Sequence, residues 1–223
     1  MLDFLGTIAT ASLTVFIVSS LLICMEAPRN AKLILAGGHG LWVGIATAGA
    51  AAGWTTIARP FPVMGVFVAA PLLAAVMATA WPAARQAMLS LPLSLLVGLN
   101  VGRVFAVLFL LLAADGRLSG PFPYSAAWGD IITGAVALPL LWLVRDSARH
   151  ATTFHLWNAF GTLDLVAAIG LGSMSAEGSR LQVFPAPGSE AMQHLPWSFV
   201  PTVLVPLWLI MHAIIWAKLR RSR

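Results

Sequence analysis

The sequence contains very little charge. Only 9% of its 223 residues are Asp, Glu, Lys or Arg, whereas 59% are hydrophobic. Soluble globular domains carry roughly a quarter charged residues. A water-soluble fold of this length has no core large enough to hide so much apolar surface. The composition therefore excludes the ordinary soluble classes and favours a lipid bilayer as the surroundings of the chain.

Cysteine, lysine and enzyme motifs are also scarce. The single cysteine, Cys24, excludes an internal disulfide, and no Cys/His cluster has zinc spacing. The two lysines, Lys32 and Lys218, fall at expected membrane edges, so no lysine lies deep enough to hold retinal. Gly-x-Ser-x-Gly, His-Glu-x-x-His and phosphate-loop motifs are absent, which disfavours a hydrolase, a transferase and an enzyme in general.

Seven apolar segments come close to the roughly 20 residues that a membrane-crossing helix needs. The expected spans are residues 5–25, 33–53, 63–81, 91–114, 126–144, 154–174 and 199–217. We therefore predict an all-α, polytopic transmembrane bundle of seven helices, forming one integral membrane domain over residues 1–223. The N-terminus carries Asp3 where a secretory signal would carry basic residues, so we expect the first span to stay in the membrane.

Basic residues between the spans predict the orientation, because cytoplasmic loops are enriched in Lys and Arg. The net charge is +5, and the basic residues are scattered among short loops, which disfavours nucleic-acid binding. One side has nine of them: Arg29, Lys32, Arg85, Arg145, Arg149, Lys218, Arg220, Arg221 and Arg223. The other side has three: Arg59, Arg117 and Arg180. We predict an outside N-terminus and a cytoplasmic C-terminus, in a multi-pass protein of the inner (plasma) membrane.

Arg103 lies in the middle of the fourth expected span, LPLSLLVGLNVGRVFAVLFLLLAA. A guanidinium stays protonated in proteins. Estimates of its cost near the bilayer midplane range from about 2.5 to more than ~10 kcal/mol. Asp164 lies at a matching depth in the sixth span and is the first expected partner. Asp130, nearer the outer end of the fifth span, is the second, because an Arg–carboxylate pair keeps both groups charged.

Neutral polar residues accompany these charges. Asn100 lies three residues before Arg103 and hence on the same helix face, while Asn158 and Thr162 share a face of the sixth span. We predict that the charged and neutral groups together bind a substrate or an ion. The predicted binding residues are Arg103, Asp164, Asp130, Asn100, Asn158 and Thr162. A purely structural clamp made by Arg103 and Asp164 is an alternative that the sequence leaves open.

Three functions agree with this pattern. The first is a small permease or binding protein for an anionic or proton-coupled solute, in which Arg103 holds the anion or the counter-charge and a carboxylate exchanges a proton. The second is a membrane protein with b-type haem ligated by His39 and His212, both in the inner third of their spans. The third is a non-catalytic membrane subunit, sensor or assembly factor, whose outer loop, residues 175–198, would bind a protein partner.

The seventh span contains two prolines, Pro201 and Pro206. Proline has no backbone N–H, so each leaves a carbonyl about one turn upstream without its usual helical partner. Transporters use such freed carbonyls to contact ions or substrates. A simple kink is the alternative interpretation.

Overall fold

A computed structural model describes residues 1–56 and 63–221 of the chain, and within these ranges the fold is entirely helical. Two residues used in the charge count, Arg59 and Arg223, lie outside the described residues. The prediction of an all-α bundle with membrane-spanning helices is confirmed, because six of the described helices are long and apolar enough to cross a membrane. A seventh span is present if a bent helix pair, α3 and α4, is counted as one.

A long loop follows α8, and several of the other described helices are separated by short turns. The α-helices are α1 (Leu2–Cys24), α2 (Arg29–Ala51), α3 (Val63–Ala78), α4 (Pro82–Ser90), α5 (Leu93–Leu99), α6 (Val107–Ala114), α7 (Phe122–Leu143), α8 (Ala151–Ser175) and α9 (Val205–Arg221). The remaining helical segments are the 3₁₀ turns η1 (Asn100–Ala106), η2 (Val144–Asp146) and η3 (Glu190–Gln193), and the π-helical η4 (Val200–Leu204).

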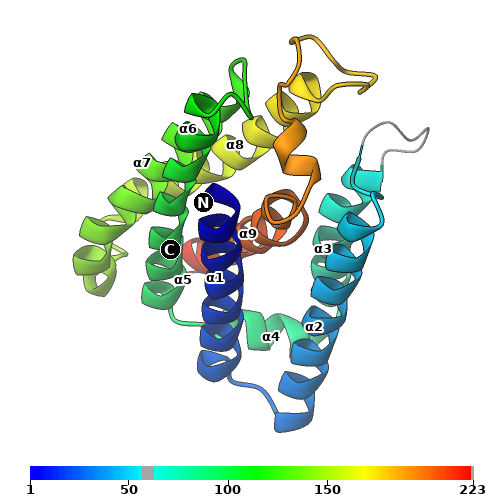
Figure 1. The fold of residues 1–223 in the computed structure, drawn as a ribbon. Coiled ribbons are helices and arrows are strands. Elements are labelled where there is room, and N and C mark those ends of the chain that lie inside the picture. Colours follow the sequence, from blue (N-terminus) through cyan, green and yellow to red (C-terminus); the bar gives the residue numbers. More distant parts are fainter. Residues whose placement is uncertain (57–62, 222–223) are drawn as a thin grey trace.

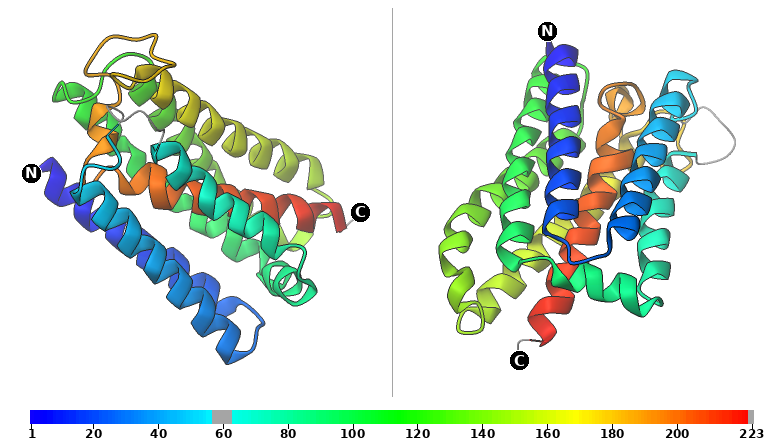
Figure 2. Two further views of the ribbon diagram at one scale, coloured as in Figure 1. Left: turned by 90° about the vertical axis from the view of Figure 1, so that its right-hand side faces the viewer. Right: turned by 90° about the horizontal axis from the view of Figure 1, so that it is seen from below.

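The last helix, α9, occupies the centre of the bundle (Figure 1). In the apolar stretch of the continuous span formed by η4 and α9, 61% of the residues are buried, against 17% in α1 and in α2. The helices α1 and α2 run antiparallel along one side of the bundle (Figure 2). Most side chains of this hairpin therefore face the surroundings, whereas α9 contacts helices on both sides.

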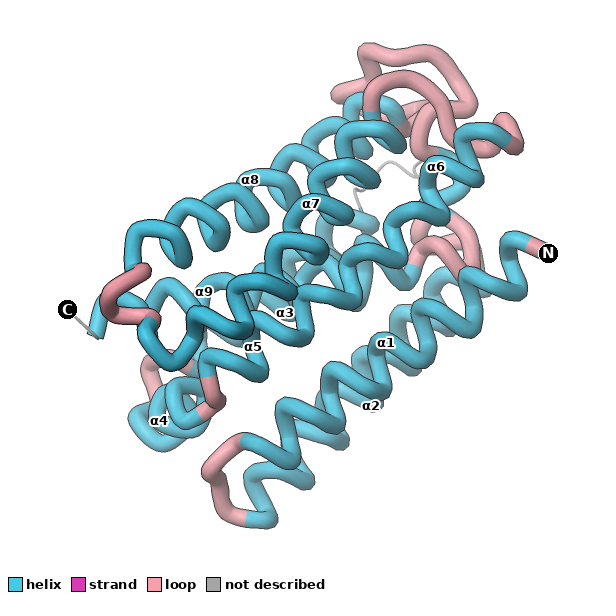
Figure 3. The backbone as a smooth tube through the Cα atoms, turned by 90° about the vertical axis from the view of Figure 1, so that its left-hand side faces the viewer, coloured by secondary structure: helices cyan, strands magenta, loops and turns pink. Residues whose placement is uncertain are grey.

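The two termini lie at opposite ends of the bundle (Figure 3). The N-terminus is at the end that carries the long loop after α8, and the C-terminus is at the end that carries α4 and the turn between α1 and α2. Termini at opposite ends require an odd number of crossings, which agrees with counting the bent pair α3 and α4 as the seventh candidate span. Which end faces the cytoplasm stays a prediction.

The third expected span, residues 63–81, is shorter than predicted. The helix α3 stops at Ala78, and the chain turns by 106° before α4 starts at Pro82. The cause is the Trp81–Pro82 step: a residue before proline avoids helical backbone angles, and Trp81 is extended, with φ −93° and ψ 113°. As a result, α4 lies across the end of the bundle instead of prolonging α3 (Figure 1).

The fourth expected span is continuous in direction but not in helix type. Between α5 and α6, the segment η1 winds as a 3₁₀ helix and carries both Asn100 and Arg103, which are fully buried. A 3₁₀ stretch inside a longer helix commonly marks a hinge or local strain. Gly102 in this segment lets α1 approach, because a methyl group there would lie 2.7 Å from Leu13 Cδ2.

The seventh span is irregular at its prolines, as its sequence suggested. In a regular α-helix the N–H of residue 206 would donate to the carbonyl of Thr202, but Pro206 has no N–H. The indole Nε1 of Trp42, on α2, donates to this carbonyl instead, at 3.0 Å. Within the described residues, the freed Thr202 carbonyl is thus occupied by a protein donor.

The predicted orientation can be tested with single cysteines. In a Cys24→Ser background, we expect a membrane-impermeant maleimide to label Arg180→Cys in intact cells, because residue 180 lies in the predicted outer loop. Arg149→Cys, at the opposite end of α8, should react only after the cells are opened. Both wild-type residues are exposed, so access to the reagent decides the outcome. The reverse labelling pattern would contradict the orientation.

Candidate functional site

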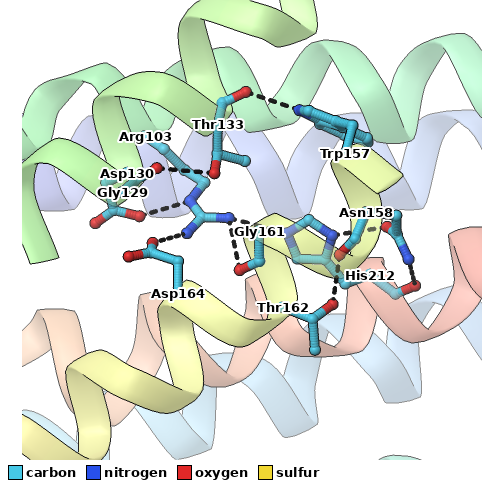
Figure 4. Close-up of polar contacts among 10 residues, drawn as sticks. All are labelled: Arg103, Gly129, Asp130, Thr133, Trp157, Asn158, Gly161, Thr162, Asp164 and His212. Atoms are coloured by element: carbon cyan, nitrogen blue, oxygen red, sulfur yellow. Dashed lines mark hydrogen bonds and ion pairs between the residues drawn. The ribbon is translucent and has the colours of Figure 1, made fainter. Parts of the chain in front are cut away.

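Four helical segments bring polar side chains together in the interior of the bundle (Figure 4). Arg103 comes from η1, Asp130 from α7, Asp164 from α8 and His212 from α9. Arg103 and His212 have no exposed surface, and the side chain of each aspartate is 7% exposed. We call these four residues the Arg103 cluster.

The guanidinium of Arg103 makes four contacts with acceptor atoms. Its Nε donates to Asp130 Oδ1 at 2.6 Å, and one terminal nitrogen donates to Asp164 Oδ2 at 2.7 Å. The other terminal nitrogen lies 2.9 Å from His212 Nε2 and 3.3 Å from the backbone carbonyl oxygen of Gly161. The cation is therefore held on three sides by groups from α7, α8 and α9.

The contacts of His212 fix its protonation state. Because a guanidinium can only donate, His212 Nε2 must accept from Arg103 and carries no proton. The ring proton is then on Nδ1, which donates to Asn158 Oδ1 at 2.7 Å. The amide nitrogen of Asn158 donates back to the carbonyl oxygen of His212 at 3.1 Å. His212 is thus a neutral imidazole with both ring nitrogens hydrogen-bonded.

Two tryptophans enclose the cluster. The Trp208 ring centroid lies 5.8 Å from the guanidinium carbon of Arg103, at a cation–π distance. The Trp157 ring lies 5.7 Å from the ring of His212, and its Nε1 donates to the carbonyl oxygen of Thr133 at 2.9 Å. Both indoles are buried and exclude water from these sides of the cluster.

Glycines make the close approach of the helices possible. A methyl group at Gly129 would overlap the carboxylate of Asp164, so Asp164 reaches Arg103 only because α7 has no side chain there. A methyl at Gly161 would lie 2.7 Å from the ring of His212, and one at Gly134 would lie 3.1 Å from the carbonyl oxygen of Asn100. Small residues at such points are the usual means by which membrane helices pack closely.

Two of the predicted binding residues lie outside these contacts. Thr162 donates to the carbonyl of Asn158 in its own helix, at 2.7 Å. The amide nitrogen of Asn100 donates to the carbonyl of Leu96 at 2.9 Å, while its Oδ1 is buried without a hydrogen-bond partner among the described residues. Asn158 joins the cluster through the ring of His212. That any of these residues binds a solute stays a prediction.

The two histidines considered as haem ligands lie in different surroundings. His39 lies half-buried on α2, whereas both ring nitrogens of His212 are hydrogen-bonded, so an iron ligand there would first have to lose Arg103 or Asn158. The helix α9 continues beyond the predicted end of the span at residue 217, to Arg221.

The sequence analysis did not predict His212 as a partner of Arg103, nor the role of Gly129. No local signal identified this contact, because it depends on how α9 packs against the segments that carry Arg103 and Asn158. Within the described residues, no group of three or more His, Cys, Asp or Glu side chains is arranged to hold a metal ion.

Residues 60–220 match a protein family described as a domain of unknown function, DUF8737. The chain belongs to this family. The match includes every residue of the Arg103 cluster, whereas α1 and α2 precede it. No curated protein and no solved structure matches the chain.

Replacing Gly129 by alanine should break the contact between Asp164 and Arg103. We expect the free energy of unfolding to fall by about 1–3 kcal/mol, the usual cost of overpacking a close contact. The measurement is thermal unfolding of the purified protein in detergent. The matched control is Gly170→Ala on α8, where a methyl meets nothing within 4 Å. Equal stability of the two variants would contradict the role of Gly129.

Removing the guanidinium should destabilise the fold more strongly. Arg103→Leu leaves two buried carboxyl groups without a counter-charge, and breaking a buried pair in this way costs about 3–5 kcal/mol. Restoring the charge balance of the cluster requires both Asp130→Asn and Asp164→Asn, since both acids contact Arg103. We expect the triple variant to recover most of the stability lost in Arg103→Leu, as measured by the same unfolding assay. A triple variant as unstable as Arg103→Leu would show that charge balance is not what holds the cluster.

Proposed function

We propose that the protein is a small proton-coupled membrane transporter or solute-binding protein, in which the Arg103 cluster takes up and releases a proton. The observation that carries this proposal is the presence of two carboxyl groups on one buried guanidinium, at 2.6 and 2.7 Å. The surrounding bundle is apolar and helical, and six or seven of its helices are long enough to span a membrane.

The charges of the cluster support proton binding. With a neutral His212, one guanidinium and two ionised carboxylates sum to a net charge of −1. An uncompensated charge in the membrane interior is costly. One proton shared by the two carboxyl groups makes the cluster neutral, and a small cation bound in its place would do the same. The cluster is therefore suited to exchange a proton for a cation or for a protonatable solute.

The contacts of Arg103 favour this form of the hypothesis over direct binding of an anion. The guanidinium already donates to Asp130, Asp164 and the carbonyl of Gly161, and it is fully buried. An anionic solute would have to displace one of the two carboxylates. Arg103 thus serves as the fixed counter-charge, and the pair Asp130 and Asp164 serves as the proton carrier.

Irregular helix segments next to the cluster support the proposal that the helices carrying it move relative to one another. Arg103 itself lies on the 3₁₀ segment η1. His212 lies on α9, and this helix follows directly on the π-helical η4. Such interruptions are frequent at hinges and functional sites. Because Arg103 contacts α7, α8 and α9, a change in the charge of either aspartate acts on three helices at once.

Infrared difference spectroscopy of the protein in lipid can detect the shared proton. We expect the wild type to show a protonated carboxyl C=O signal that disappears as the pH is raised. Asp130→Asn and Asp164→Asn should each abolish this signal, because the remaining carboxylate is then balanced by Arg103 and needs no proton.

Asp115→Asn, which changes an exposed acid at the end of α6, is the control and should leave the signal unchanged. In vesicles loaded with a pH-sensitive dye, a Na⁺ or K⁺ gradient should change the internal pH faster with the wild type than with either aspartate variant. A wild type without a protonated carboxyl signal would instead identify Arg103 and its partners as a static clamp between helices.

A further inference from the structure

A second site lies away from the Arg103 cluster, at the end of the bundle where α4 crosses. A crevice of about 460 Å³ opens between α3, α4 and α9. Its walls are mostly apolar, and they come from one face of each helix, since the lining residues recur at helical spacing. The apolar lining residues are Leu72, Ala75, Val76, Met88, Leu89, Leu209, Ile210, Ala213, Ile214 and Ala217.

Three arginines stand at one end of this crevice. Arg85 comes from α4, and Arg220 and Arg221 come from the last turn of α9. The 106° bend before α4 brings Arg85 to the same place as the other two. All three side chains are exposed, and among the described residues none forms an ion pair with a carboxylate. The crevice is thus apolar along its length and cationic at its end.

A smaller pocket of about 370 Å³ adjoins this end and shares Arg85, Leu89 and Arg221 with the crevice. It is lined by more polar groups, including Ser90 and Gln86, and by the carboxylic acid Glu26, whose negative charge offsets only one of the three arginines. The shared arginines therefore connect the apolar crevice to a more polar pocket.

We propose that this site binds one anionic phospholipid, with an acyl chain in the crevice between α3 and α9 and the phosphate on Arg85, Arg220 and Arg221. The polarity of the walls matches that of the ligand. The apolar acyl chain would contact the apolar walls, and the anionic headgroup would contact the arginines at the end of the crevice. Basic pockets between membrane helices on the cytoplasmic side are suited to anionic headgroups. The arginines belong to the side with nine basic residues, which the sequence predicts to be cytoplasmic.

The lipid site does not depend on proton exchange by the Arg103 cluster. Its lining residues and the four residues of the cluster are different, so each can be changed while the other is kept. An apolar crevice without cations at its end would bind a phospholipid with little preference for its headgroup. The preference for an anionic headgroup is therefore the property to measure.

Native mass spectrometry of the full-length protein in detergent, with added phosphatidylglycerol or phosphatidylcholine, tests the proposal. We expect one phosphatidylglycerol to be retained by the wild type in preference to phosphatidylcholine. The combined change Arg85→Gln, Arg220→Gln and Arg221→Gln should weaken its binding by at least about tenfold, given the contribution of each cation to anionic lipid binding. The matched control, Arg145→Gln with Arg149→Gln, removes exposed basic residues outside the crevice and should retain the lipid.

A second variant tests the apolar part and keeps all three arginines. Ala213→Phe fills the crevice and should also weaken phosphatidylglycerol binding, whereas Ala167→Phe, on an exposed face of α8, should not. If the arginine variant fails to fold, the comparison of Ala213→Phe with Ala167→Phe still tests whether the crevice binds the lipid. Three results would each overturn the proposal. The wild type could retain both lipids equally, or the control variant Arg145→Gln with Arg149→Gln could lose phosphatidylglycerol as strongly as the crevice variant. Inorganic phosphate could also displace the lipid completely.

Discussion

The buried charge of Arg103 is the constraint on which the interior of this bundle depends. A guanidinium cannot lose its proton, so the fold must supply acceptors at its depth. It does so with Asp130 and Asp164, and with a neutral His212 whose tautomer is set by Asn158. The absence of a side chain at Gly129 follows from the same need, since only then does Asp164 reach the cation.

The central helix connects this cluster to the rest of the molecule. The span that ends in α9 carries His212 within the cluster, and one turn earlier Trp208 covers the guanidinium. Near its start, the carbonyl left free by Pro206 accepts a hydrogen bond from Trp42 on α2. The first two helices precede the stretch that defines the family, yet α2 provides this hydrogen bond to the central span. Packing in the centre therefore depends on a helix at the periphery.

Much of the fold was predictable, because apolar length alone identifies helices that can cross a membrane. Individual spans were less predictable where backbone chemistry interrupts them. The Trp81–Pro82 step turns an expected straight end into a crossing helix, and η1 winds as a 3₁₀ turn inside an expected α-helix. The first could have been read from proline's effect on the preceding residue. The second has no comparable local signal, and η1 packs closely against α7 at Gly134.

For the candidate site, the sequence by itself determined that a permanent cation lies deep in an apolar segment, and depth pointed to Asp164 and Asp130 as its partners. Only the tertiary structure decided that both acids bind at once, that His212 completes the set, and that Thr162 and Asn100 hydrogen-bond within their own helices. The physical reason is that sequence spacing gives the depth and face of a side chain along one helix. Which helices become neighbours, and how closely, is set by packing between segments far apart in the chain.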